Sequence, residues 1–181
     1  MFLGKYKLML GSDCKLIYGT ADYHRKRLKV LESERYIRRV NRLYIKLDDK
    51  GTRLVKEFGY NYSYKCRRKE YIDRLNEIAK VGALTLDSNI DFIASWNIKD
   101  DDIFTEQSRK YLGKMIYQEK EFIVYYIAKG KRKSYVSQIL NDIRKLVSYK
   151  NIIIFVEDFN LIKAKRNFVF GNDSTVVINP I

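Results

Sequence analysis

The sequence predicts a two-part chain of the α+β and α/β classes. Between Gly11 and Gly59, turn residues separate short amphipathic helices from one pair of strand-forming stretches. After Asn61 the order changes to a helix, three strand-like stretches, a helix and a buried-type strand. With 181 residues, 46% of them hydrophobic, the chain can bury one core or two small ones. We therefore predict domains at residues 1–60 and 61–181.

The first part contains two short helices, a hairpin and a third helix. Gly11-Ser12-Asp13, a turn with residues that can cap a helix, precedes the predicted helix CKLIYG. Gly19-Thr20 again places a glycine and a capping residue before the second predicted helix, ADYHRKRLKVLES. RYIRRVNRLYIKLDD follows, with strand formers on both sides of Asn41-Arg42, a plausible hairpin turn. Asp48 or Asp49 then caps KGTRLVKEFG, which stops at Gly59. In the helix at 21–33, Ala21, Leu28 and Leu31 share an apolar side, and the basic residues point elsewhere.

The second part alternates helices and strands. YKCRRKEYIDRLNEIAKVG has the apolar spacing of an amphipathic helix, with Gly82 beyond its end. Strands are expected at 90–98, 113–118 and 121–128, with a short polar turn between the last two. A helix at 133–150, a buried strand at 151–158, a short helix at 160–167 and a final strand at 174–179 complete the chain.

Positive charge is the strongest global signal. The chain has 36 Lys and Arg against 22 Asp and Glu, a net charge of +14, which favours a polyanionic partner. From Asp22 to Lys46 there are nine basic and three acidic residues, whereas KDDDIFTEQ at 99–107 has the opposite sign. The basic character is regional, so we favour a binding face over a merely solvated surface.

Other classes of site have little support in the sequence. Cys14 and Cys66 have only His24 to join them, too few ligands for a disulfide framework or a zinc site. Phosphate-binding loops, dinucleotide fingerprints, HExxH and nucleophile elbows are missing. No apolar run is long enough to span a bilayer. We therefore expect a cytoplasmic protein with no cofactor, no metal and no membrane partner.

RLKVLESERYIRR followed by LYIKLDDKGTRLVKEFG resembles the winged helix-turn-helix family: a recognition helix, a two-stranded wing and a closing helix introduced by Leu-x-x-Lys-Gly. In that fold the recognition helix enters the major groove of DNA and the wing lies along the backbone or in the minor groove. The segment before Ser12 is short for the family's first helix. The resemblance implies these DNA-facing residues: Tyr23, His24, Arg25, Lys26, Arg27 and Lys29 on the helix, and Arg38, Arg39 and Arg42 on the wing.

The order helix, three strands, helix, strand resembles the core of the restriction-endonuclease-like (PD-(D/E)xK-type) fold. Its active members hold a divalent cation with acids near the second and third strands. In FIVYYIAKGKRKSY, Tyr126 and Ala128 occupy the positions where the metal-binding carboxylates of the third strand would lie. The second strand begins with Gly113-Lys114 in place of an acid. Of the family's catalytic residues, only the lysine has a candidate here, Lys129. A lysine without metal-binding carboxylates cannot form a hydrolytic site of this type, so we expect no catalytic residues and a degenerate αβββαβ domain.

The two parts together resemble the replication-relaxation and mobilisation proteins of plasmids and mobile elements. That resemblance implies a regulator that occupies double-stranded DNA in replication, mobilisation or transcription, with a homodimer as the usual way to read a palindrome. The second domain would serve dimerisation, protein contact or a secondary DNA contact through Lys129, Lys131, Arg132 and Lys133. Two alternatives stay open: a phage or mobile-element protein that binds and inhibits a host protein or protein–nucleic-acid complex, and a metal-dependent nuclease with a non-standard site.

Overall fold

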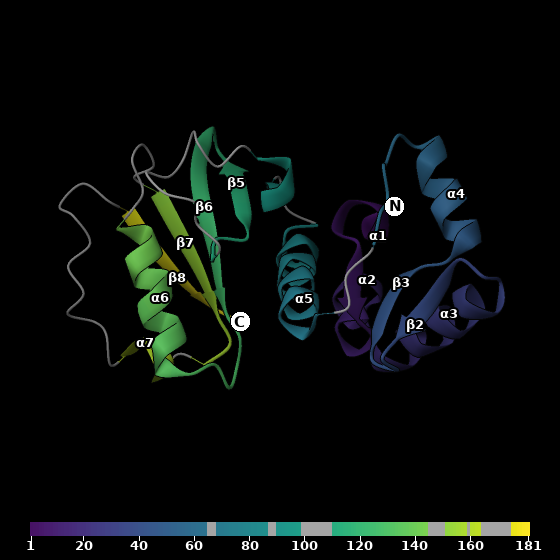
Figure 1. Cartoon of the computed structure of the whole chain (residues 1–181), viewed down its shortest axis with the longest axis horizontal. Coiled ribbons are helices and arrows are strands. Elements are labelled where there is room, and N and C mark those ends of the chain that lie inside the picture. Colours follow the sequence, from purple (N-terminus) through teal and green to yellow (C-terminus); the bar gives the residue numbers. More distant parts are fainter. Residues whose placement is uncertain (65–67, 87–89, 99–109, 145–150, 159, 164–174) are drawn as a thin grey trace. The chain divides into compact units, whose positions relative to one another are not determined.

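The protein is a mixed α+β chain with two sheets, described here by a computed structural model (Figure 1). The structure describes residues 1–64, 68–86, 90–98, 110–144, 151–158, 160–163 and 175–181. It divides the chain into two compact units, Met1–Asp87 (unit 1) and Ser88–Ile181 (unit 2). This confirms the predicted class at the level of α+β.

The boundary between the units lies after helix α5 (Lys69–Leu84), not at residue 60 as the sequence predicted. Polar contacts tie α5 to the rest of unit 1. The Asn76 side chain accepts a hydrogen bond from the Leu10 backbone N–H (2.6 Å) and donates one to Asp13 (3.2 Å). Lys80 forms an ion pair with Asp13 (3.3 Å). The predicted order of elements changes near residue 60, but these contacts, made across more than sixty residues of sequence, assign α5 to unit 1.

Unit 1 has a three-stranded antiparallel sheet in the order β1-β3-β2. The predicted hairpin and helices are present, and α1 and β1 are additions that no sequence pattern indicated. Gly19 has a φ of 80° in the turn before α3, and Thr20 is its N-cap. In chain order, the elements before α5 are α1 (Phe2–Tyr6), β1 (Leu8–Leu10), the 3-10 helix η1 (Gly11–Cys14), α2 (Lys15–Tyr18), α3 (Ala21–Ser33), β2 (Ile37–Val40), β3 (Tyr44–Leu47) and α4 (Asp49–Glu57).

Two local features explain how the hairpin and α4 are held. Asn41 and Arg42 both have positive φ, 51° and 59°, as the tight turn between two twisted strands requires. At Gly51, a Cβ atom would collide with the backbone carbonyl oxygen of Tyr36. The glycine of the Leu-x-x-Lys-Gly stretch is therefore needed for α4 to approach the start of the hairpin.

Gly82 does not end α5 as predicted, because the helix continues to Leu84. A Cβ atom at Gly82 would meet the Tyr6 ring. This glycine therefore provides space for α1 to pack against α5, a role that its position near the end of a periodic pattern does not reveal.

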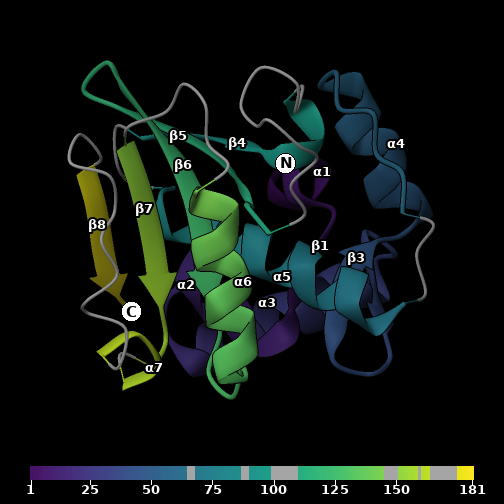
Figure 2. The same cartoon turned by 60° about the vertical axis from the view of Figure 1, so that its left-hand side comes forward.

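Unit 2 has one five-stranded sheet in the order β4-β5-β6-β7-β8. The first three strands are antiparallel neighbours, and β6, β7 and β8 run parallel (Figure 2). Its elements are β4 (Asp91–Ala94), the 3-10 helix η2 (Ser95–Asn97), β5 (Gly113–Tyr117), β6 (Lys120–Ile127), α6 (Lys133–Ile143), β7 (Asn151–Val156), α7 (Asn160–Lys163) and β8 (Thr175–Pro180). The strand predicted at 90–98 is shorter than expected. The ends predicted for the helices at 133–150 and 160–167, and the acidic stretch 99–107, lie wholly or partly outside the described residues.

Helix α6 covers one face of this sheet (Figure 2). Ile123, Tyr125 and Ile127 alternate along β6, so their side chains point to the same face, where they join Val136 and Ile139 of α6 in a buried cluster. The apolar run FIVYYIA is therefore a structural strand whose core face is packed by the crossover helix.

Candidate nucleic-acid interface

Helix α3 has one buried stripe and a wide exposed face. His24 and Leu28 are buried and Leu31 is half-buried, and the spacing i, i+4, i+7 places the three on one side. The predicted apolar side therefore includes Leu28 and Leu31, with a histidine beside them. On this helix, the exposed residues of the predicted DNA-facing set are Tyr23, Arg25, Lys26, Arg27 and Lys29.

His24 does not face solvent, which corrects its assignment as a DNA-facing residue. Its side chain is only 6% exposed, and its ring Nδ1 lies 3.3 Å from the carbonyl oxygen of Thr20. A carbonyl only accepts hydrogen bonds, so Nδ1 donates. The polar ring is thereby satisfied in the interior one turn before Leu28. Tyr23 and Val30 of the same helix are 59% and 44% exposed.

A hollow of about 350 Å³ lies between α3 and the hairpin. Arg25 and Lys29 line it from α3, and Arg39 and Arg42 line it from β2 and the turn. We call this set of four residues the cationic hollow. Gly11 and Ser12 form part of its floor. The fold thus brings together basic side chains up to seventeen positions apart in the sequence.

The basic residues of the hairpin differ in how far their charge is compensated. Arg39 forms an ion pair with Glu32 (3.0 Å), and Arg38 lies 3.7 Å from Asp48. Within the part of the chain that the structure describes, Arg25, Lys29 and Arg42 form no ion pair. Net positive charge therefore remains at the cationic hollow.

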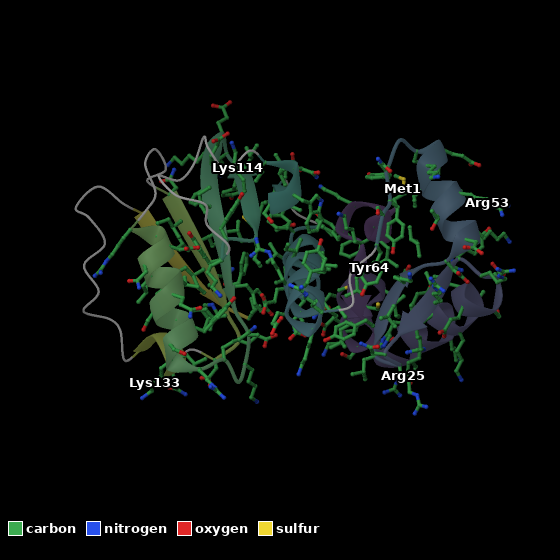
Figure 3. The ribbon with its side chains drawn as sticks, in the orientation of Figure 1. Met1, Arg25, Arg53, Tyr64, Lys114 and Lys133 are labelled. Carbon is green, nitrogen blue, oxygen red and sulfur yellow. The ribbon has the colours of Figure 1, made fainter. Side chains whose placement is uncertain are left out.

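Arg27 belongs to a different side of α3. It is exposed at the rim of a second, mostly apolar cavity of about 430 Å³, together with Leu28 and Leu31. Two positions along a helix correspond to about 200° of rotation, so Arg27 points nearly opposite to Arg25 and Lys29. Figure 3 marks Arg25 on α3 and Arg53 on α4 of the same unit.

The second basic cluster lies in unit 2, between β6 and α6. Lys129, Arg132 and Lys133 are exposed, and Lys131 is half-buried. The Lys131 ammonium lies 4.7 Å from the centroid of the Tyr135 ring, a cation–π contact that fixes its direction. These four residues form a local group of charge at the start of α6, where Figure 3 marks Lys133.

A carboxylate that the sequence interpretation did not consider lies beside this cluster. Glu157 follows β7, and it accepts hydrogen bonds from the Tyr126 hydroxyl (2.7 Å) and the Lys129 backbone N–H (2.7 Å). Because β6 and β7 are parallel, residues that follow their carboxyl ends meet at one edge, and this signal could have identified Glu157. Glu119 and Glu121 lie at the opposite end of β6 from Glu157. Asp91 pairs with Ile116 in β4–β5, and Asp87 lies outside the described residues.

The described residues lack two other kinds of feature. Among them, no group of three or more His, Cys, Asp or Glu side chains is placed to hold a metal ion. None of their helices combines the length and the apolar character that a bilayer crossing requires.

Comparisons with known proteins find no match for this chain among family models, curated proteins or solved structures.

Proposed function

We propose that unit 1 binds double-stranded DNA as a winged helix, with α3 as the recognition helix and the β2–β3 hairpin as the wing. The observation that carries the proposal is the cationic hollow. Arg25 and Lys29 of α3 and Arg42 of the turn lie around one concave surface with no ion-pair partner among the described residues. A phosphate group is an anion that fits between such side chains, and phosphate contacts supply most of the affinity of DNA-binding proteins.

The exposed face of α3 suits a groove flanked by two phosphate backbones. On a helical wheel Tyr23, Lys26 and Val30 occupy the middle of this face, and all three are exposed. The cationic hollow lies at one edge and Arg27 at the other. We infer that the middle residues meet base edges, while the two edges contact phosphates of opposite strands.

The position of the charges along α3 also favours binding. Arg25, Lys26 and Arg27 lie in the first two turns, and the last turn has no basic residue. A cation stabilises a helix through the macrodipole when it lies in the last turn, by about 0.3–1 kcal/mol. Because the basic residues of α3 are absent from that turn, they do not stabilise the helix in this way, which supports a role in contacting an anion.

The short first helix, which departed from the winged-helix pattern, has a compensating neighbour. Helix α5 packs against α1, β1 and α2. The DNA-binding unit in this proposal is therefore 1–87 rather than 1–60. The sheet of unit 2, an antiparallel meander followed by a parallel crossover strand, supports the proposal of a degenerate restriction-endonuclease-like domain.

For the biological role, we propose action on the DNA of a plasmid or phage in replication, mobilisation or transcriptional control. The group Lys129, Lys131, Arg132 and Lys133 is proposed as a secondary DNA contact. Its contribution is measurable in the full chain, because removing two of these charges should reduce the salt dependence of binding without changing sequence preference.

Fluorescence anisotropy with labelled duplex DNA, titrated over salt, tests the proposal. Replacing Arg25 and Lys29 by alanine should weaken binding at least tenfold and lower the slope of log affinity against log salt by about 2. The matched control is Arg53→Ala with Lys56→Ala, which removes the same charge from exposed positions of α4. Equal losses in the two variants would show that only net charge matters. No binding of the wild-type chain at low salt would overturn the proposal and favour a protein partner.

A further inference from the structure

The second cavity belongs to unit 1 and is partly open to solvent. Its volume is about 430 Å³, and every element of the unit before α5 contributes to its wall. The wall consists mainly of apolar side chains, which include Phe2 of α1, Met9 of β1, Ile17 of α2, Leu31 of α3, Ile45 of β3 and Val55 of α4. We call this space the apolar cavity.

The size and composition of the apolar cavity favour an organic occupant over water. Pockets for small molecules typically measure about 300–1,000 Å³ and are lined mainly by apolar side chains with a few polar groups. Water held against this mainly apolar wall has few polar partners. Met1, Phe2 and Leu3 form one part of the wall.

The charged groups of the wall make the two ends of the apolar cavity electrostatically different. Arg27 and Glu34 both line it, and neither forms an ion pair within the described part of the chain. They are seven positions apart along α3 and its cap, a rise of about 10 Å. An anionic group is therefore attracted to the Arg27 end and repelled from the Glu34 end.

We propose that the apolar cavity binds a medium-chain aliphatic carboxylate, with the carboxylate at Arg27 and the hydrocarbon chain among the apolar side chains. A guanidinium group forms paired, charge-assisted hydrogen bonds with a carboxylate, which an alcohol of the same length cannot replace. Burial of the hydrocarbon chain supplies the remaining affinity.

Ligand binding in the apolar cavity would affect the proposed DNA-binding surface through α3. Leu28 lines both the apolar cavity and the cationic hollow, and Arg27 and Leu31 lie on the same helix. A ligand that repositions α3 changes the spacing of Arg25 and Lys29 relative to Arg42. This coupling rests on the proposed DNA binding, whereas the ligand site itself does not.

Isothermal titration calorimetry of the full chain tests the site without DNA, using decanoate, decanol and decylamine below their aggregation limits. We expect decanoate to bind most tightly. Arg27→Gln should weaken decanoate binding at least tenfold and leave decanol binding unchanged, while the control Arg53→Gln changes neither. Unchanged thermal unfolding would confirm that Arg27→Gln is folded.

Several results would overturn the proposal: no binding of decanoate, equal affinity for decanoate and decanol, or no effect of Arg27→Gln. DNA anisotropy with and without decanoate then measures the coupling. Decanoate binding by a chain that does not bind DNA would support the site and reject the proposed function. DNA binding by a chain that does not bind decanoate would support the proposed function and reject the ligand site.

Discussion

Replacement of Asn76 by alanine tests whether α5 is an integral part of unit 1. The side chain satisfies the Leu10 backbone N–H (2.6 Å), and its loss leaves this donor in a partly buried position without the partner that it now has. Leaving a buried donor unsatisfied costs about 1–3 kcal/mol. Asp13 loses one hydrogen bond but keeps Lys80 at 3.3 Å, so its charge remains compensated. We therefore expect unit 1 to lose about 2 kcal/mol of its free energy of unfolding.

For a domain of this size, a loss of about 2 kcal/mol corresponds to a fall in melting temperature of about 8–16 °C. Thermal and urea unfolding, followed by far-UV circular dichroism, measure the change, and hydrogen exchange locates it in β1 and α5. The matched control is Asn61→Ala, at an exposed position of the same unit. A loss below about 0.5 kcal/mol for Asn76→Ala, within the usual range for surface substitutions, would refute the assignment of α5 to unit 1.

Three further predictions concern the same unit. A fragment of residues 1–87 should unfold cooperatively, whereas residues 1–60, which lack α5, should not; circular dichroism melts decide this. Burial, with a contribution from Asp13, raises the pKa of Cys14 from an ordinary 9.0 to about 12. In a Cys66→Ser chain at pH 8, Cys14 should therefore react with a thiol reagent about 1,000-fold more slowly than in urea, and similar rates would contradict this. Burial also raises the pKa of Tyr62 from 10.0 to about 12, so the folded state keeps a proton that the unfolded state releases. The stability that depends on this Tyr62 proton is complete below pH 10 and is lost between pH 10 and pH 12. Urea titrations at several pH values should therefore show a smaller loss of stability over this range in Tyr62→Phe than in the wild-type chain.

Local sequence patterns were enough to predict most of the regular elements of both units, although not α1 and β1. The hairpin turn at Asn41-Arg42 was predicted from strand formers on both sides of two residues, and both residues adopt positive φ. The continuous apolar run FIVYYIA and the spacing of the helix that follows predicted β6 and α6. These predictions depend on periodicity over a few residues, which the chain expresses before any tertiary contact forms.

The candidate site was only partly predictable. The basic residues of α3 and the hairpin were identified from charge alone, but charge could not separate His24, which lies on the buried stripe, from Arg25 beside it. Nor could it show that Arg25 and Lys29 face the hairpin while Arg27 faces the apolar cavity. Glu157 was missed, because its position beside Lys129 depends on the parallel pairing of β6 and β7.

The sequence by itself determined the α+β class, the order of the helices and strands after β1 and the regional excess of positive charge, because these properties depend on residue type and short-range spacing. Only the tertiary structure decided that α5 joins unit 1, that β1 adds a third strand and that the cationic hollow and the apolar cavity lie on different sides of α3. Each of these depends on contacts between residues far apart in the sequence. Such contacts are selected by packing and hydrogen bonding among folded elements, and no local pattern records them.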